Sequence, residues 1–326
     1  MKKTILSAFA FVAIAASITI YSCKKETQTQ LQQPPSASSG FNVSVKNNLL
    51  VFKTTEDYRN VVDNSSPEQM VKFMSEVKAM TNFTSYDKQY FSKNPSLLSD
   101  STLINSDFLK TILNKDAAVQ IGNYIYKIDI ANEKVFALHA SHEDQYVDVV
   151  NGNTSNSNVQ SFSTNDNVLD LIEESGQKKT ESTMLFCKED GIGSYAETTN
   201  YIYVDNDGEI RLKGDLAYRR FGIYFHLFAE GFIVDRLTNI MTSINMKIEV
   251  DYNSWYYHVR CGKTVGPYTP GPFSGAGHYK YDSYEGSSSL NKVFVRTRYT
   301  ATVPPSPSAP FGYVKTSNWI QIRVNY

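Results

Sequence analysis

Apolar residues along the chain follow two different spacings, and the change falls near residue 180. Up to residue 178, short apolar runs are interspersed with the three-to-four-residue spacing of amphipathic helices. From residue 184 onward the helical spacing almost disappears, and short apolar runs separated by turn residues take its place. The pattern therefore predicts an α+β domain over residues 41–178 and an all-β domain over residues 179–326.

The strongest helical pattern begins after Ser66, a typical N-cap residue, which is followed by Pro67, a residue favoured at the first helical position. A stripe rich in methionine can serve as an adaptable binding surface, but at helical spacing a core face explains it without a partner. We expect one apolar face to be buried, made of Met70, Phe73, Met74, Val77 and Met80.

Shorter signals define the rest of the first domain. Ser106 is expected to cap a short helix that ends near Asn114, and residues 164–174 form a third helix with one apolar side. The Asn- and Ser-rich residues 151–161 are expected to form a loop. Strands are predicted at residues 49–52 and, as a hairpin, at residues 124–130 and 134–138.

The second domain is predicted to be an antiparallel β-sandwich or a barrel-like fold. Residues 205–208 carry an Asp-Gly turn signal between two strand patterns, and the loops at 262–276 and 304–310 are rich in Gly or Pro. Seven or eight short strands with intervening turns are typical of such folds. The expected strands are 201–204, 209–212, 223–228, 246–252, 255–261, 278–284, 293–303 and 319–324.

The amino terminus has the pattern of a secretory signal. Lys2 and Lys3 precede an uncharged, largely apolar run over residues 4–20, which ends just before Cys23. A single transmembrane anchor is the alternative, because the run approaches the minimum of about 17 residues that spans a bilayer. The polar residues after Cys23 favour a tether over residues 23–40, since they include too few apolar side chains to fold.

The residues around Cys23 resemble the lipobox of bacterial lipoproteins, and the Ser-Cys-Lys-Lys run resembles lipoproteins of the Bacteroidota. The match departs from the commonest lipobox, which has Leu where Ile20 stands and Ala or Gly where Ser22 stands. The resemblance implies that a signal peptide of residues 1–22 is removed and that Cys23 is acylated. It also implies an envelope protein, lipid-anchored to a bacterial membrane, with the outer membrane favoured and its periplasmic or surface face left open.

A second resemblance covers residues 107–172, which include the run Gln-Ile-Gly-Asn-Tyr-Ile-Tyr-Lys-Ile at residues 120–128. This pattern is similar to an uncharacterised domain of predicted Bacteroidota lipoproteins. It spans well under half of the chain, and it implies no activity.

The charge of the chain narrows the classes of partner. Lys and Arg number 32 against 33 Asp and Glu, so the net charge of -1 offers no electrostatic footprint for nucleic acid. We expect no nucleic-acid partner and no cofactor, and contact with the membrane only through the lipid anchor. The 22 Tyr and 18 Phe residues suit the half-buried surfaces of β-sheets.

Besides Cys23, the chain holds Cys187 and Cys261, both in the predicted β domain. Export to an oxidising compartment favours a disulfide between them, which would stabilise the fold by about 4.5 kcal/mol in the chain-entropy model. The alternative is two buried free thiols. Export also makes Ser101 a candidate for O-glycosylation, because the triplet of residues 100–102 resembles the O-glycosylation site of exported Bacteroidota proteins.

Catalytic and metal-binding motifs are weak. His139 and His142 lack the spacing of a zinc protease and are expected to be surface residues, while the acidic turn at residues 205–209 lacks the first carboxylate of a calcium loop. Carboxylate pairs such as Asp144 with Asp148 require a known separation before they indicate glycoside hydrolysis. We therefore expect neither a metal site nor catalytic residues, and an enzyme is the less favoured interpretation.

Aromatic residues near the long Gly- and Pro-rich loop give the most specific functional hypothesis. Trp255, Tyr257, Tyr268 and Phe273 are predicted to line an exposed site for a glycan or a protein. Sheet-favouring aromatics with no binding role are the alternative. The sequence thus favours a non-catalytic binding module at the cell envelope, with a hydrolase of envelope or environmental polymers and a structural envelope protein as alternatives.

Overall fold

The computed structural model describes residues 41–90, 104, 106–176, 195–204, 208–238, 240–251, 253–257, 273–290, 292–305 and 311–324. Ser39–Tyr326 form one compact unit, so the domain boundary predicted after residue 178 lies inside that unit. Residues 177–194, where this boundary falls, lie outside the described residues, and the division into domains remains a prediction.

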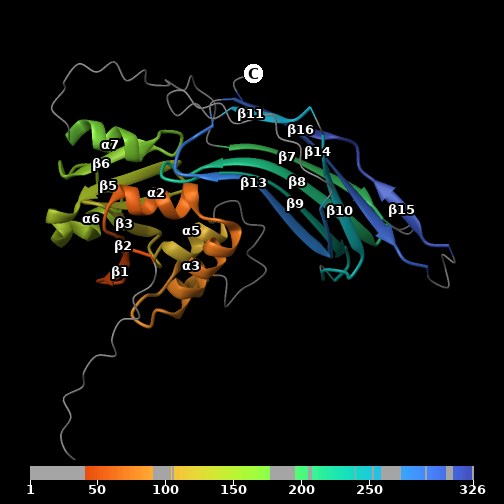
Figure 1. The fold of residues 1–326 in the computed structure, drawn as a ribbon, viewed down its shortest axis with the longest axis horizontal. Helices are drawn as coiled ribbons and strands as arrows, with labels where there is room; N and C mark the ends of the chain where they lie inside the picture. The colour runs from red at the N-terminus through yellow and green to blue at the C-terminus, as the bar shows by residue number, and fades with distance from the viewer. Residues whose placement is uncertain are drawn as a thin grey trace, which may run out of the picture. The chain divides into compact units, whose positions relative to one another are not determined.

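The first part of the unit is built on a six-stranded sheet in which the strands follow one another in sequence order (Figure 1). Neighbouring strands are antiparallel except β2 and β3, which are parallel. The predicted strand at 49–52 and the predicted hairpin at 124–138 are confirmed, but part of the predicted loop at 151–161 belongs to β6. The strands are β1 (Val43–Lys46), β2 (Leu49–Phe52), β3 (Ala118–Ile121), β4 (Tyr124–Asp129), β5 (Lys134–His139) and β6 (Val159–Ser163).

Side-chain capping explains where the two longest helices begin. Thr54 accepts a hydrogen bond from Asp57 and Ser66 accepts one from Gln69, and each forms a reciprocal capping box. The helix capped by Ser66 is therefore confirmed, whereas the helix after Thr54 was not predicted. The helices are α2 (Thr55–Asn64), α3 (Pro67–Ala79), α4 (Tyr86–Tyr90), α5 (Asp107–Ile112), the 3-10 helix η2 (Ala140–Gln145), α6 (Tyr146–Val150) and α7 (Val168–Gly176).

Helices α2, α3, α5 and α7 pack their apolar sides with the strands of this sheet in one core. Met70, Phe73 and Val77 of α3 are buried in it, with Met74 and Met80 packed against its margin, so the methionine-rich stripe is a core face. A smaller cluster contains Val149 of α6 together with Phe136, Leu138 and Val159. The helices and the sheet thus form one packed α+β layer, and the methionine-rich face of α3 is not an exposed binding surface.

The second part of the unit consists of two antiparallel sheets, which confirms the predicted β-sandwich. One sheet has the strand order β13-β9-β8-β7, and the other has the order β11-β14-β10-β12, with β15 and β16 also paired to β14. The described strands do not close into a barrel. Their bounds are β7 (Tyr195–Tyr203), β8 (Ile210–Arg220), β9 (Phe225–Asp235), β10 (Asn245–Val250), β11 (Trp255–Tyr257), β12 (Phe273–Ala276), β13 (His278–Gly286), β14 (Lys292–Val303), β15 (Tyr313–Thr316) and β16 (Ile320–Val324).

Tyr299 of β14 joins the two sheets of the sandwich. Its ring lies against two glycines, because a Cβ atom added to Gly214 would be 2.3 Å from the ring and one added to Gly231 would be 3.2 Å from it. Gly214 and Gly231 are paired across β8 and β9, so together they leave the space that the ring fills. The Tyr299 hydroxyl donates a hydrogen bond of 2.5 Å to the carbonyl of Asp215, which satisfies this buried polar group.

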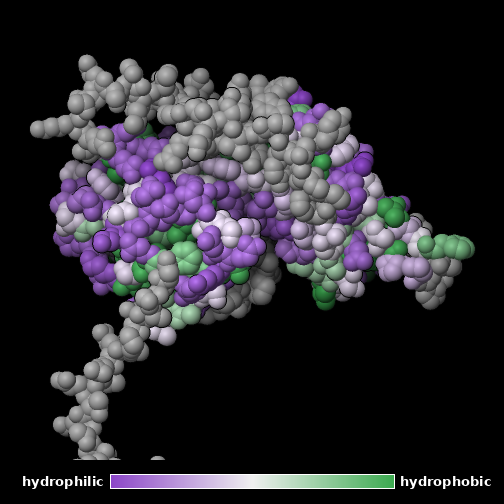
Figure 2. All heavy atoms as spheres, viewed as in Figure 1, coloured by the Kyte–Doolittle hydropathy of each residue, from purple (hydrophilic) through white to green (hydrophobic). Residues whose placement is uncertain are grey.

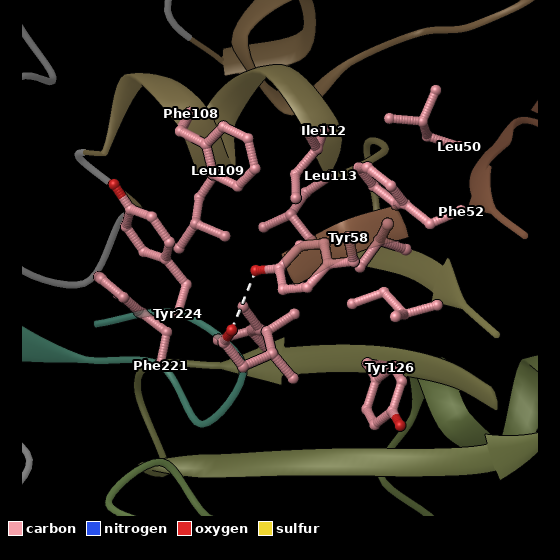
Figure 3. Close-up of a cluster of buried hydrophobic side chains, with 14 of the residues drawn as sticks. Leu50, Phe52, Tyr58, Phe108, Leu109, Ile112, Leu113, Tyr126, Phe221 and Tyr224 are labelled. Carbon is pink, nitrogen blue, oxygen red and sulfur yellow. Dashed lines mark hydrogen bonds between the residues drawn. The ribbon is translucent and has the colours of Figure 1, made fainter. Parts of the chain in front are cut away.

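The turn between β8 and β9 enters the core of the α+β layer. Phe221, Ile223 and Tyr224 belong to the same buried cluster as Phe108 of α5, and the Phe108 and Tyr224 rings stack with centroids 5.3 Å apart. Figure 3 shows the Tyr58 hydroxyl pointing to this turn, where it donates a 2.9 Å hydrogen bond to the Ile223 carbonyl. The strand predicted at 223–228 is therefore wrong for its first two residues, because their apolar character fits a buried turn.

Exposed residues of the helical layer are mostly hydrophilic in the view of Figure 2, whereas hydrophobic residues are exposed near β15. Phe311 and Val314, beside and within that strand, are both among the large exposed apolar side chains. No helix in the described part of the chain has the length and apolar character to cross a membrane.

Candidate functional site

The candidate site is the outer face of the four-stranded sheet β13-β9-β8-β7. Leu212, Leu216, Leu227 and Ile233 lie in the sandwich core, so the alternate residues on β8 and β9 point away from it. Cross-strand pairing arranges the outward residues in rows. In the order β7, β8, β9 and β13, two rows are Tyr201, Lys213, Phe232, His278 and Thr199, Asp215, Glu230, Lys280; on β8, β9 and β13, two further rows are Ala217, Phe228, Asp282 and Arg219, His226, Glu285.

At one end of this face, aromatic and cationic side chains alternate. Tyr201 and Tyr203 leave 51% and 54% of their surface exposed, which is unusual for aromatic side chains of this size. Tyr203 is paired with Arg211, and Tyr201 begins the first complete row. We define the aromatic platform as Tyr201, Tyr203, Arg211, Lys213, Phe232 and His278.

Ring contacts hold the aromatic platform in place. The rings of Phe232 and His278 stack at a centroid distance of 4.5 Å with only 9° between their planes. The Lys213 ammonium lies 6.0 Å from the centre of the Phe232 ring, and the Arg211 guanidinium lies 4.8 Å from that of Tyr201. Both cations are within the range of attraction to an aromatic face, so each contributes to the packing of its aromatic neighbour on this face.

Acidic residues of the next row tie the platform to the sheet. The His278 ring contacts the Glu230 carboxylate at 2.8 Å, and the Lys213 ammonium lies 2.6 Å from the Asp215 carboxylate. Asp215 also accepts a 2.6 Å hydrogen bond from the Thr199 hydroxyl. These contacts fix the orientation of His278 and Lys213 before any ligand arrives, which lowers the entropic cost of binding.

The other end of the face holds a cluster of titratable groups around His226. Nε2 of His226 lies 2.5 Å from the Asp282 carboxylate and 3.7 Å from that of Glu285. The Tyr224 hydroxyl donates a 2.6 Å hydrogen bond to Glu285, and the Lys280 ammonium lies 3.1 Å from Asp282. We call these five residues the His226 cluster.

Local charges set the protonation of the His226 cluster. Burial would raise the pKa of Asp282, but the hydrogen bond from His226 and the charge of Lys280 hold that pKa well below its ordinary value. Burial opposes the charge of Lys280, yet the surrounding carboxylates, led by Asp282, raise its pKa. Burial, reinforced by the charge of Glu285, raises the pKa of Tyr224 well above its ordinary value, so its hydroxyl remains a donor.

The residues predicted to bind a ligand cannot be compared with these two regions. The backbones of Trp255 and Tyr257 form β11 and that of Phe273 begins β12, but their side chains lie outside the described part of the structure. Tyr268 lies wholly outside it. The same holds for Cys23, for the possible disulfide of Cys187 with Cys261, and for Ser101, so these remain predictions.

His139 and His142 lie at the start of and within the 3-10 helix η2. His139 caps η2, where its Nδ1 contacts the hydroxyl of Ser141 at 2.7 Å. Among the described residues, the group of His and acidic side chains close enough to hold a metal ion is His226, Asp282 and Glu285, which does not include His139 or His142.

The aromatic platform and the His226 cluster were both missed from the sequence. The alternation of apolar and polar residues on β8 and β9 is visible, but which strands are neighbours is not. Comparisons with family models, with curated proteins and with solved structures each found no match. The function of the chain is therefore inferred from the geometry of this face.

Proposed function

We propose that the chain is a lipid-anchored protein of a bacterial envelope that binds a glycan through the aromatic platform. The observation that carries this proposal is the pair of half-exposed residues, Tyr201 and Tyr203, on the same sheet face as the stacked rings of Phe232 and His278. Sugar rings present C–H groups that stack on aromatic faces, and such sites rely on aromatic side chains at little entropic cost.

The size and charge of the platform support a chain of sugars rather than a single one. The platform spans four adjacent strands, from β7 to β13. At a spacing of about 4.8 Å between strands, this width is roughly 14 Å. Arg211 and Lys213 lie on β8, between Tyr201 and Tyr203 of β7 and Phe232 of β9. A guanidinium at this position can bind a carboxylate with two hydrogen bonds. We therefore favour an acidic oligosaccharide over a neutral one.

Anchoring is part of the same proposal. Removal of residues 1–22 and acylation of Cys23 would hold the platform close to the membrane on a polar tether of residues 23–40. Replacement of Cys23 by Ser should abolish the incorporation of an alkyne-labelled fatty acid. Label that persists in this variant would contradict the lipid anchor without bearing on glycan binding.

A glycan array probed with the full-length protein tests the binding function. We expect binding to acidic oligosaccharides, and we expect Tyr201→Ala and Tyr203→Ala each to weaken it by about 1 to 3 kcal/mol, as for an aromatic hot spot. Phe311→Ala is the matched control, because Phe311 is also an exposed aromatic residue but is not part of the platform. Equal binding by all four proteins, or no binding to any glycan, would refute the proposal.

The same incubations separate binding from the two alternatives that the sequence leaves open. Chromatography of the recovered oligosaccharide should show chains of unchanged length. Shortened chains would indicate the hydrolase, and neither binding nor cleavage would favour the structural envelope protein.

A further inference from the structure

A β-bulge places two carboxylates beside His226. Along a regular strand, residues three positions apart point to opposite faces of the sheet. The pairing of β13 with β9 shifts register between Asp282 and Tyr284, so that Asp282 is paired with Phe228 and Glu285 with His226. Because Phe228 and His226 share the outer face, the bulge brings both acidic side chains to that face.

The three donor atoms are close enough to share one ion. His226, Asp282 and Glu285 each offer one ligand atom, and these three atoms all lie within 4.8 Å of one another. Ligand bonds of about 2.0 to 2.2 Å in a tetrahedral site place donor atoms roughly 3.3 to 3.6 Å apart. The 3.7 Å distance between His226 and Glu285 needs to shorten by only about 0.1 Å, and the 2.5 Å distance between His226 and Asp282 needs to lengthen by about 1 Å.

We propose that His226, Asp282 and Glu285 form a binding site for a divalent transition-metal ion of the zinc type. Imidazole is a ligand for zinc and similar metals, whereas calcium and magnesium favour sites made entirely of oxygen donors. Three protein ligands leave a fourth tetrahedral position for water, the arrangement found in open zinc sites.

The surroundings of the three ligands support metal binding. The His226 side chain is 2% exposed and its ring stacks with that of Phe228 at 4.6 Å, so the imidazole is held in one orientation. Tyr224 donates a hydrogen bond to Glu285, as outer residues commonly do to a metal-binding carboxylate. Asp282 and Glu285 are 39% and 28% exposed, which gives an ion a route from solvent.

Lys280 provides the charge that a metal ion must displace. Its ammonium lies 3.1 Å from the same Asp282 oxygen that contacts His226. A bound ion would take the place of the hydrogen between His226 Nε2 and the Asp282 carboxylate. The positive charge of the nearby Lys280 ammonium would repel this ion. Lys280→Met keeps the length and the apolar stem of the side chain, and it should therefore tighten metal binding severalfold.

Titration of the full-length protein with Zn²⁺ against a chromophoric chelator tests the site. We expect one ion per chain, with an affinity that falls at least about tenfold in Glu285→Gln, since the amide still accepts the Tyr224 hydrogen bond but is a poor ligand. Glu230→Gln is the matched control: Glu230 contacts His278 on the same two strands but is not one of the three side chains close enough to share an ion, so its replacement should leave the affinity unchanged.

X-ray absorption of the zinc-loaded wild-type protein gives an answer that does not depend on any variant. A first shell of nitrogen and oxygen that includes one imidazole supports the site, whereas sulfur in that shell would assign the ion to the cysteines and overturn it. A wild-type protein that binds no Zn²⁺ at micromolar concentration, or a folded Glu285→Gln variant with unchanged affinity, would also overturn it. None of these outcomes depends on a glycan, so the metal site and the proposed function fail separately.

Discussion

The two ends of strand β9 carry apolar residues of similar kind in opposite environments. Before the strand, Phe221, Ile223 and Tyr224 are buried in the core of the α+β layer. After the strand, Leu237, Ile240 and Met241 are 72%, 65% and 47% exposed. An apolar turn residue therefore does not by itself predict whether the turn is packed or free.

The hydrogen bonds of the two turns explain the difference. At the buried end, the carbonyls of Gly222 and Ile223 accept bonds from Val168 of α7 and Tyr58 of α2. At the exposed end, the Asp235 carboxylate accepts bonds from the nearby backbone N–H groups of Leu237 and Thr238. The buried turn relies on hydrogen bonds from helices of the α+β layer, whereas the N–H groups of Leu237 and Thr238 in the exposed turn are bonded to the neighbouring Asp235 side chain. Substitutions at the two ends of β9 should therefore differ in their effect on stability.

Gly222→Ala should have the largest effect. Gly222 has a φ of +74°, and a Cβ atom there would lie 2.6 Å from Val135 and 3.0 Å from Val168. Backbone strain of about 1 to 3 kcal/mol and overpacking of about 1 to 3 kcal/mol should together lower the free energy of unfolding by about 2 to 6 kcal/mol. Urea denaturation measures the loss.

Gly208→Ala is the control that separates packing from backbone strain. Gly208 has a similar φ of +71°, but its added Cβ would meet Tyr203 only at 3.7 Å, an ordinary contact. This variant should lose only the strain contribution. Equal losses in the two variants would mean that the Gly222 turn is not packed as described.

Tyr58→Phe should have the next largest effect. The substitution removes the donor to the Ile223 carbonyl and leaves that buried acceptor without its 2.9 Å partner. The expected loss is about 1 to 3 kcal/mol in the free energy of unfolding. Tyr203→Phe, which removes an exposed hydroxyl, should change stability by less than about 0.5 kcal/mol, and a similar loss from both variants would contradict the assigned role of Tyr58.

Thr54→Ala should lower stability by about 1 kcal/mol, because Thr54 caps the helix that carries Tyr58. The hydrogen bond from the Thr54 side chain is the main cause of the lowered pKa of Asp57, and burial only partly opposes it. A lowered folded-state pKa stabilises the protein above the unfolded value of about 3.9, and this contribution is lost as the pH falls. The loss of stability caused by Thr54→Ala should therefore be smaller at pH 3 than at pH 7. A larger loss at pH 3 than at pH 7 would contradict this role of Thr54.

Local signals in the sequence predicted the elements that depend on local physics. Ser66 and Pro67 mark the start of α3, and short apolar runs between turn residues mark most strands of the sandwich, because capping and turn signals are properties of neighbouring residues. Thr54 and Asp57 form an equally local capping box, so the sequence also contains the signal for the start of α2, a helix absent from the predicted elements. The prediction places Ile223 and Tyr224 of the turn in a strand, because the burial of this turn depends on a partner layer far away in sequence.

The candidate site depended on two facts that the sequence does not contain. Tyr201 and His278 share a row only because β7, β8, β9 and β13 are neighbours in that order. Asp282 and Glu285 share a face only because of the register shift after Asp282. Strand order and bulges are set by tertiary packing, so the earlier expectation of no metal site weighed only residues close together in sequence, such as His139 and His142.

Leu237→Ser combined with Ile240→Ser should have the smallest effect, within about 0.5 kcal/mol of wild type, because neither side chain loses a buried contact. The backbone around them is held by the bond from Asp235 N–H to the Ile240 carbonyl, which the substitutions leave in place. Ile223→Ser at the other end of β9 is the matched comparison and should cost several kcal/mol, since it buries an unpaired hydroxyl and removes a fully buried side chain. Thermal unfolding of the two proteins side by side measures the contrast. A large loss in the Leu237 and Ile240 variant would show that the exposed turn is covered in solution, and the two ends of β9 would then differ in partner rather than in burial.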